Sequence, residues 1–256
     1  MPELILVTGG TGNLGSKVVQ RLQERGCRVR VLSRKERGGE EGAEYVVGDL
    51  GKRTGIDEVL AGVDVIVHCA SASKGDVEAT RNLVEAAKAL KSPPHLIYIS
   101  IVGVNAVSFG YFRDKLKAEK IIVDSDLPWT LQRATQFFDY VLGGAKRLTR
   151  FPIVPVPKDF KVQAIDVREV ADRLVDLALK PPAGRVRDLG GPEVSTWADM
   201  IRQYLGVYHK RRLVVPFVMP GTRAIRAGGL LVSEQPAGQE QKAGRLTWEQ
   251  FVAQNR

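Results

Sequence analysis

Two residues with the right spacing for proton transfer lie in the stretch GYFRDKLKAE, residues 110 to 119. Tyr111 and Lys115 are four residues apart, so in a helix they share one face. A phenol ordinarily ionises near pH 10, and a nearby ammonium makes it a stronger acid. The pair is therefore a candidate acid/base couple. The same spacing also suits two ordinary residues on a half-exposed helix, so the surrounding elements must decide.

A glycine-rich turn follows the first apolar segment, in VTGGTGNLGS. Its glycines match GxGxxG at Gly10, Gly12 and Gly15, and a helix is expected from Asn13. Such glycines permit a tight turn, close approach of a pyrophosphate and close packing of helix on strand. The context favours dinucleotide binding over a purely structural turn. The expected contacts are Gly9, Thr11, Gly12, Asn13, Leu14 and Gly15.

The end of the second predicted strand distinguishes the two nicotinamide cofactors. An NAD site usually has an acid about 20 residues after the glycines. Here the segment is VLSRKER, with Ser33 and Arg34 at that place and no carboxylate before Glu36. A hydroxyl and a guanidinium suit a 2′-phosphate, so we expect NADP(H) rather than NAD(H). After the third strand, Asp49 and Leu50 could contact the adenine, or Asp49 could simply begin a turn.

Strand-like apolar runs alternate with helical patterns through the first half of the chain. This predicts an α/β fold, a Rossmann-type doubly wound parallel sheet. Ala70 and Ser71, at the carboxyl end of the fourth strand, are expected to contact the cofactor. The expected strands are 4–8, 28–33, 44–48, 63–69, 95–100 and 129–133, and the expected helices are 13–26, 77–90 and 111–125.

The pattern changes near residue 150, so we expect an NAD(P)-binding domain at 1–150. A smaller, mostly helical C-terminal region, 151–256, would cover the substrate and interleave with the first. Residues 151–158 carry three prolines and indicate an extended connector. Helices are expected at 167–180, 196–206 and 246–254. Residues 216–231 suggest a lid or core packing rather than a membrane-touching helix, and 232–245 a mobile loop.

Composition argues against several other classes of function. The net charge is +9, but the bases are dispersed, and Lys210–Arg212 reads as a solvated surface rather than a nucleic-acid site. His68 and Cys69 are neighbours in a strand and point to opposite faces, so no metal site is expected. No signal peptide or spanning segment is evident. We expect a cytoplasmic protein with a small-molecule substrate and without a nucleic-acid or membrane partner.

Six pieces in order across residues 1–135 resemble the short-chain dehydrogenase/reductase superfamily, in its extended and atypical members near the NmrA-like NAD(P)-binding group. They are VTGGTGNLG, GDL, VDVIVHCAS, DVEATRNLVEAA, YIS and YFRDK. The resemblance implies that Tyr111 is the general acid or base and that Lys115 binds the nicotinamide ribose and acidifies the phenol. Two positions depart from the family pattern. Ser100 is followed by Ile101 where a second hydroxyl is common, and Asp76 stands where an asparagine is often found.

Together these features predict an NADP(H)-dependent oxidoreductase that transfers a hydride to a carbonyl or quinone-like small molecule, with Tyr111, Lys115 and Ser100 as catalytic residues. One alternative is an NmrA-like sensor, which would bind NADP(H) without turnover and report to a protein partner. A second alternative is an enzyme similar to nucleotide-sugar epimerases or dehydratases. Those usually have longer chains and NAD(H), so Arg34 and the short C-terminal region disfavour it.

Overall fold

The computed structural model describes residues 2–37, 42–71, 75–232 and 244–256. Its contacts divide the chain into two compact units. Unit 1 contains residues 1–100, 109–133 and 170–187, and unit 2 contains residues 101–108, 134–169 and 188–256. This division differs from a boundary near residue 150, because both units are assembled from separated stretches of chain.

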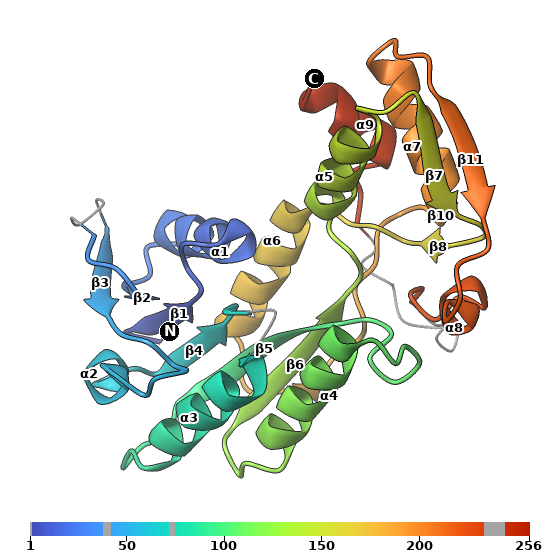
Figure 1. Ribbon diagram of the computed structural model, residues 1–256. Helices are drawn as coiled ribbons and strands as arrows, with labels where there is room; N and C mark the ends of the chain where they lie inside the picture. The colour runs from blue at the N-terminus through green and yellow to red at the C-terminus, as the bar shows by residue number, and fades with distance from the viewer. Residues whose placement is uncertain (1, 38–41, 72–74, 233–243) are drawn as a thin grey trace, which may run out of the picture. The chain divides into compact units, whose positions relative to one another are not determined.

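Unit 1 is built on one parallel sheet, in the order β3-β2-β1-β4-β5-β6-β9 (Figure 1). The order reverses between β1 and β4, as in doubly wound sheets. The strands are β1 Ile5–Thr8, β2 Val29–Ser33, β3 Ala43–Val47, β4 Val65–His68, β5 His95–Ile101, β6 Trp129–Ala134 and β9 Gly184–Arg185. The near-continuous apolar runs thus form strands covered on both faces, and the predicted Rossmann-type fold is confirmed.

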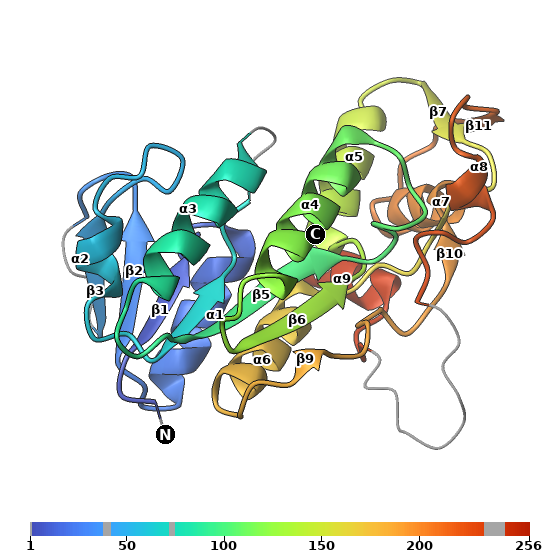
Figure 2. The same cartoon turned by 90° about the horizontal axis from the view of Figure 1, so that it is seen from below.

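Helices cover both faces of this sheet. On one face α2 Ile56–Leu60, α3 Asp76–Lys88 and α4 Gly110–Val123 pack over a core that includes Leu6, Ile66 and Leu96. Figures 1 and 2 both show α3 and α4 side by side. On the other face α1 Asn13–Glu24 lies beside the later turns of α6 Val167–Ala178, and Arg21 Nε donates to Asp172 Oδ1 at 2.8 Å.

Unit 2 holds the remaining elements. Its core includes an aromatic cluster in which the ring of Phe138 lies 5.6 Å from Trp248 and 5.1 Å from Phe251. The elements are α5 Phe138–Leu148, β7 Ile153–Pro157, β8 Lys161–Val162, β10 Ser195–Thr196, α7 Trp197–Val207, β11 Leu213–Phe217, α8 Arg223–Arg226 and α9 Trp248–Gln254.

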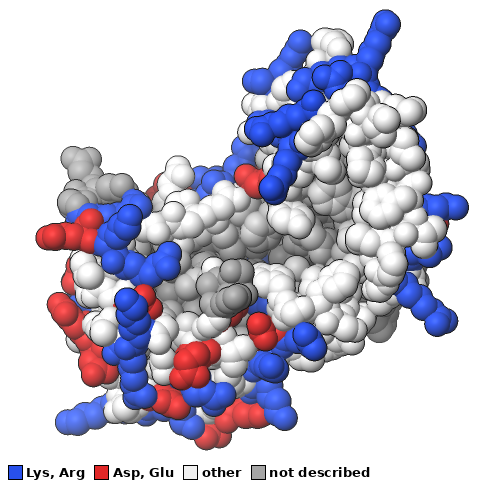
Figure 3. All heavy atoms as spheres, viewed as in Figure 1, with Lys and Arg blue, Asp and Glu red and all other residues white. Residues whose placement is uncertain are grey.

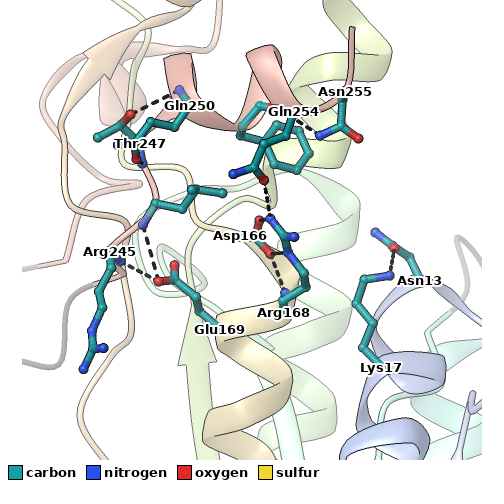
Figure 4. Close-up of polar contacts among 12 residues, drawn as sticks. Asn13, Lys17, Asp166, Arg168, Glu169, Arg245, Thr247, Gln250, Gln254 and Asn255 are labelled. Atoms are coloured by element: carbon teal, nitrogen blue, oxygen red, sulfur yellow. Dashed lines mark hydrogen bonds and ion pairs between the residues drawn. The ribbon is translucent and has the colours of Figure 1, made fainter.

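The start of α6 binds the last segment of the chain within unit 2 (Figure 4). Glu169 Oε1 accepts the backbone N–H of Arg245 at 2.6 Å, and Arg168 Nη2 donates to Gln254 Oε1 at 3.1 Å. A capping box, in which Thr247 and Gln250 exchange hydrogen bonds, begins α9. These contacts explain why a short terminal helix is held in place.

The proline-rich segment 151–158 is not a connector. Residues 153–157 form β7, which pairs in parallel with β11. Proline removes a backbone donor only at its own position, so the alternate residues Val154 and Val156 keep theirs. The expected mobile loop at 232–245 falls mainly on 233–243, outside the described residues. Among those described, no helix is long and apolar enough to cross a membrane.

Candidate cofactor and active site

The glycine loop joins β1 to α1 as a compact turn. The N–H of Gly12 donates to the carbonyl of Gly9 at 2.9 Å, and the N–H of Ser16 donates to Gly12 at 3.0 Å. Gly9 has φ +68°, and a Cβ there would lie 2.6 Å from the backbone nitrogen of Ala70. Only glycine fits that position without strain, because the loop passes directly against the end of β4.

Gly15 and Gly12 serve different purposes. A Cβ on Gly15 would lie 2.1 Å from the carbonyl oxygen of Gly9, so its absence lets the helix pack on the turn. Among the described residues, a Cβ on Gly12 would have only that same oxygen within 4 Å, at 3.2 Å. Gly12 therefore borders open space, which leaves room for an anion to approach the backbone.

The N-terminus of α1 is suited to hold that anion. No side chain in the described part of the chain caps it, and no acid lies in its first turn, so its N–H groups and its dipole are available to a phosphate. Thr11 and Asn13 are exposed there, and Asn13 Oδ1 accepts from Lys17 Nζ at 3.4 Å (Figure 4). Leu14 instead lies in the core. The loop and helix together fit a dinucleotide pyrophosphate.

The end of β2 presents a free cation. Arg34 is exposed and has no hydrogen bond or ion pair within the described part of the chain. Ser33 is buried, and its hydroxyl donates to the carbonyl of Lys35 at 2.8 Å. Of the two residues expected to recognise a 2′-phosphate, Arg34 is thus available, whereas Ser33 stabilises the turn that carries it.

The residues expected near the adenine are largely structural. Asp49 Oδ1 accepts the N–H groups of Gly51 and Lys52, at 2.8 and 3.2 Å. The carboxylate thereby stabilises a turn. The side chain of Leu50 is part of the core, and its carbonyl accepts from Asn82 Nδ2 at 2.7 Å.

The end of β4 lies against the loop through the backbone. The N–H of Ala70 donates to Thr8 Oγ1 at 3.3 Å. Ser71 is exposed, and its hydroxyl donates to Asp76 Oδ2 at 3.4 Å, which connects it to the first turn of α3. The carboxyl ends of β1 and β4 therefore lie next to each other, beside the glycine loop.

Lys115 is the centre of a buried polar network in unit 1. Its side chain is 3% exposed. The ammonium lies 3.2 Å from Asp76 Oδ2 on α3 and donates to the phenolic oxygen of Tyr98 on β5 at 3.1 Å. Because α3 and α4 pack side by side on this face of the sheet, the Asp76 carboxylate and the Lys115 ammonium lie between the two helices.

The protonation states of this network follow from burial and charge. Burial opposes the charge on Lys115, but Tyr98, Tyr111 and Asp76 outweigh it and raise its pKa above the ordinary value. Burial also raises the pKa of Tyr98 to about 12, although the ammonium acts in the opposite direction. At neutral pH Tyr98 is therefore a neutral phenol, and Asp76 carries the negative charge that faces the ammonium.

His68 extends the network but is not a proton carrier at neutral pH. Its Nδ1 lies 2.6 Å from Thr8 Oγ1, its Nε2 lies 3.2 Å from Thr80 Oγ1, and its ring is 5.4 Å from that of Tyr98. Burial, and then the charge of Lys115, lower its pKa to about 3. Burial raises the pKa of the neighbouring Cys69 thiol to about 12. No group of side chains in the described ranges could hold a metal ion.

Tyr111 and Ser100 are the other two residues expected to be catalytic, and they differ in exposure. Tyr111 is 43% exposed, with its ring centroid 5.9 Å from Lys115 Nζ. Ser100 is two residues beyond Tyr98 on β5 and therefore on the same sheet face. Its Oγ is buried and has no hydrogen-bond partner within the described residues. The next residue, Ile101, is apolar and lies on the opposite face, so the second polar group of the family pattern is missing here.

A second buried ion pair holds α4 in place. Arg133 on β6 donates through Nε to Glu119 Oε1 at 2.8 Å, and both side chains are 7% exposed. Glu119 lies one turn beyond Lys115 on the same helix face. The position of Lys115 is thus fixed from α3, β5 and β6 together.

Sequence reasoning missed two members of this site, Asp76 and Tyr98. Asp76 was noted only as a departure from the family's asparagine, and Tyr98 was noted only as part of a strand. The signal for Asp76 was an acid in the first turn of the helix that comes after β4 in the chain. Its partner could not be identified without the packing of α3 on α4.

Comparisons with known proteins identify the family to which the chain belongs. A family model described as NAD(P)H-binding matches residues 9–181. The (4-alkanoyl-5-oxo-2,5-dihydrofuran-3-yl)methyl phosphate reductase of Streptomyces griseus is 32% identical over 78% of this chain and 72% of its own length. Photosystem II assembly factor Ycf39 of Cyanophora paradoxa is 26% identical over 77% of this chain and 66% of its own length. Each of these two relatives therefore contains further residues outside the part that matches this chain.

The fold also has solved counterparts. The NADPH-dependent quinone oxidoreductase QOR2 of Escherichia coli, complexed with NADPH, superposes with a TM-score of 0.82 at 17% identity, covering 98% of this chain and 99% of that one. This likeness shows the fold. The expected class, an oxidoreductase of the NAD(P)-binding Rossmann superfamily, is confirmed by the findings together.

Proposed function

The chain belongs to the NAD(P)H-binding family, and from that premise we propose that it is an NADPH-dependent reductase of a carbonyl or quinone-like small molecule. The observation that carries the proposal is the buried, charged Lys115 one helical turn from the exposed Tyr111. Both lie in the unit that holds the glycine loop.

The residues that would hold the cofactor are those with free donors. The open side of Gly12 and the N-terminus of α1 would receive the pyrophosphate. The guanidinium of Arg34 would pair with a 2′-phosphate, which favours NADPH over NADH. When bound, NADPH supplies the hydride for the reduction.

The protein's own residues would supply the proton and its orientation. The Tyr111 hydroxyl would give its proton to the substrate oxygen as negative charge develops there, and Lys115 would provide the nearby positive charge. The free hydroxyl of Ser100 would donate a hydrogen bond to the same oxygen. Asp76 and Tyr98 would keep the ammonium in place throughout.

One observation favours a second candidate, a sensor that binds the dinucleotide without turnover. The Lys115 ammonium already contacts Asp76 and Tyr98. The negative charge of Asp76 would offset part of the positive charge with which Lys115 could stabilise the Tyr111 phenolate. A site of this kind could bind NADP(H) while donating protons poorly. The matched Ycf39 proteins, named as assembly factors, show that the relatives are not all named as reductases.

Cofactor binding is tested first, by fluorescence titration of the wild type with NADPH and with NADH. Arg34→Ala should remove most of the preference for NADPH. Arg28→Ala is the matched control, because Arg28 is exposed at the opposite end of the same strand and should leave both affinities unchanged. Equal affinity for the two cofactors, or a preference that survives Arg34→Ala, would refute the assignment of NADPH.

Turnover then separates the two candidates. NADPH absorbance is followed with a panel of quinones, aldehydes and ketones. Consumption of NADPH with any of them supports the reductase. Tight NADPH binding without consumption across the panel supports the sensor, and binding of neither cofactor would refute both.

A further inference from the structure

Unit 2 exposes an apolar sheet face that is unusual for a protein surface. The pairing of β7 with β11 aligns Ile153 with Leu213, Val215 with Pro155 and Phe217 with Pro157. Because strand side chains alternate between faces, these residues share one face, while Val154 and Val156 point to the other and are buried. Ile153 is 55% exposed and Leu213 is 62% exposed. We call this surface the β7–β11 face.

The β7–β11 face continues beyond the strands. Phe151 precedes β7 and is 61% exposed, and Val218 follows β11 and is 63% exposed. The helix α7 contacts the strands, and the residues Val154 and Val156 beneath it are buried. Single exposed apolar side chains are common, but a contiguous group of this size usually marks an interaction surface.

Basic residues border this face at both ends. Because β7 and β11 are parallel, the residues that precede them, Arg150 with Arg211 and Arg212, lie at one end. Lys158 follows β7 at the other end, beside Asp159, whose Oδ2 lies 3.7 Å from Arg226 Nη2. Residues 200–231 contain six Lys or Arg and no Asp or Glu in the printed sequence. In Figure 3 the surface over β7 and β11 is mostly uncharged, with lysine and arginine atoms at its margins.

An open groove adjoins the basic end. It has a volume of about 770 Å³ and is lined by Arg202, Lys210, Arg211 and Arg212, together with Leu213 and other apolar atoms. Leu213 therefore belongs both to the groove and to the β7–β11 face. Apolar side chains thus lie directly beside a concentration of positive charge.

We propose that the β7–β11 face docks on the surface of an anionic lipid bilayer. Phe151, Leu213 and Phe217 would enter the boundary between headgroups and acyl chains, and Arg211 and Arg212 would contact lipid phosphates. This proposal departs from the expectation of no membrane contact, because the exposure of these apolar residues depends on strand pairing. It concerns unit 2 alone and does not depend on the proposed reductase activity.

The chemistry of the β7–β11 face favours an anionic bilayer over a second copy of the chain or a nucleic acid. A second copy of the chain in a parallel arrangement would bring the arginine-rich ends together, which is unfavourable. In the reverse arrangement those arginines would face Lys158 and Asp159, whose charges offset each other. A nucleic acid would meet aliphatic side chains at the centre of the face, which offer its phosphates and base edges no hydrogen bonds. An anionic bilayer satisfies both the basic ends and the apolar centre.

The test is co-sedimentation of the full chain with extruded vesicles. One set is phosphatidylcholine alone and the other includes about one third phosphatidylglycerol, first at low salt and then at about 0.5 M, where charges are screened within a few ångströms. The wild type should bind the anionic vesicles and release at high salt. Leu213→Ser with Phe217→Ser should weaken binding by about tenfold or more, since each side chain loses apolar burial. Arg211→Ala with Arg212→Ala should also weaken it.

Val123→Ser is the matched control, because Val123 is 45% exposed on α4 and belongs to unit 1. It should bind like the wild type. All of the substitutions are on the surface, and circular dichroism with NADPH titration verifies folding. The proposal is overturned if the wild type does not sediment with anionic vesicles or binds neutral ones equally. It is also overturned if the Leu213 and Phe217 variant binds normally, or if those substitutions instead abolish a dimer in gel filtration.

Discussion

Removal of the carboxylate of Asp76 should be among the most destabilising single changes in unit 1. The pair with Lys115 has an N–O distance of 3.2 Å, with side chains 6% and 3% exposed. In Asp76→Ala the ammonium would remain buried without that carboxylate. Breaking a buried pair in this way costs about 3–5 kcal/mol of unfolding free energy, because the remaining charge is uncompensated.

The chain offers a matched control in a surface pair of similar geometry. Arg53 Nη1 and Glu85 Oε2 lie 2.9 Å apart, but their side chains are 58% and 49% exposed, and Glu85 is on α3 like Asp76. Solvent screens such a pair, so Glu85→Ala should cost less than about 1 kcal/mol. The two variants differ mainly in burial, which is the quantity that the argument depends on.

The assay is urea unfolding at pH 7, followed by circular dichroism, on a double-mutant cycle of Asp76→Ala and Lys115→Met. The double variant should recover much of the loss, because it no longer buries a lone ammonium. The reasoning is refuted if Asp76→Ala costs no more than Glu85→Ala. Strict additivity of the two single changes would refute it equally.

Three further predictions concern the same unit. Gly12→Ala should fold nearly normally but bind NADPH more weakly, since its Cβ would fill the open side of the loop. Gly15→Ala should instead lower the melting temperature, because its Cβ would lie 2.1 Å from the Gly9 oxygen. His68, with its pKa lowered to about 3, takes up a proton more readily when unfolded, so stability should fall as pH drops below about 6.5. In urea titrations between pH 7 and pH 5, His68→Gln should lose about 2 kcal/mol less than the wild type, and equal losses would contradict the buried neutral ring. Ser100→Ala should reduce kcat by about tenfold or more without changing NADPH affinity, and an unchanged kcat would exclude its hydroxyl from the reaction.

Much of unit 1 was predictable from sequence because its signals are local. The strands β1, β2, β4, β5 and β6 are near-continuous apolar runs, and each was expected within about two residues of its observed ends. The glycine spacing around Gly12 located the turn and the start of α1 in the same way.

Unit 2 was less predictable because its structure depends on distant pairing. Prolines made residues 153–157 resemble a connector, and their role as a strand appears only when β11 pairs with them. The helix α5 contains Gly143 and Gly144, which weaken a helical pattern, and Trp197 packs close to Gly144. Tertiary packing therefore overrides local propensity at these elements.

The sequence predicted some residues of the candidate site, but not which residues contact one another. Tyr111 and Lys115 were expected from their spacing, and the structure places them on one helix. The engagement of Lys115 by Asp76 and Tyr98 depends on the packing of α3, α4 and β5. Spacing along the chain carries no information about such a contact.

The measurement that most directly tests the central claim is the NADPH-dependent turnover of Tyr111→Phe beside Tyr140→Phe. Tyr140 is 71% exposed on α5 in unit 2 and serves as the control for the loss of a phenolic hydroxyl. If Tyr111 donates the proton, its variant should lose about 100-fold or more in kcat while NADPH affinity and the Tyr140→Phe rate stay at the wild-type values. Equal turnover by the wild type and Tyr111→Phe would contradict the account.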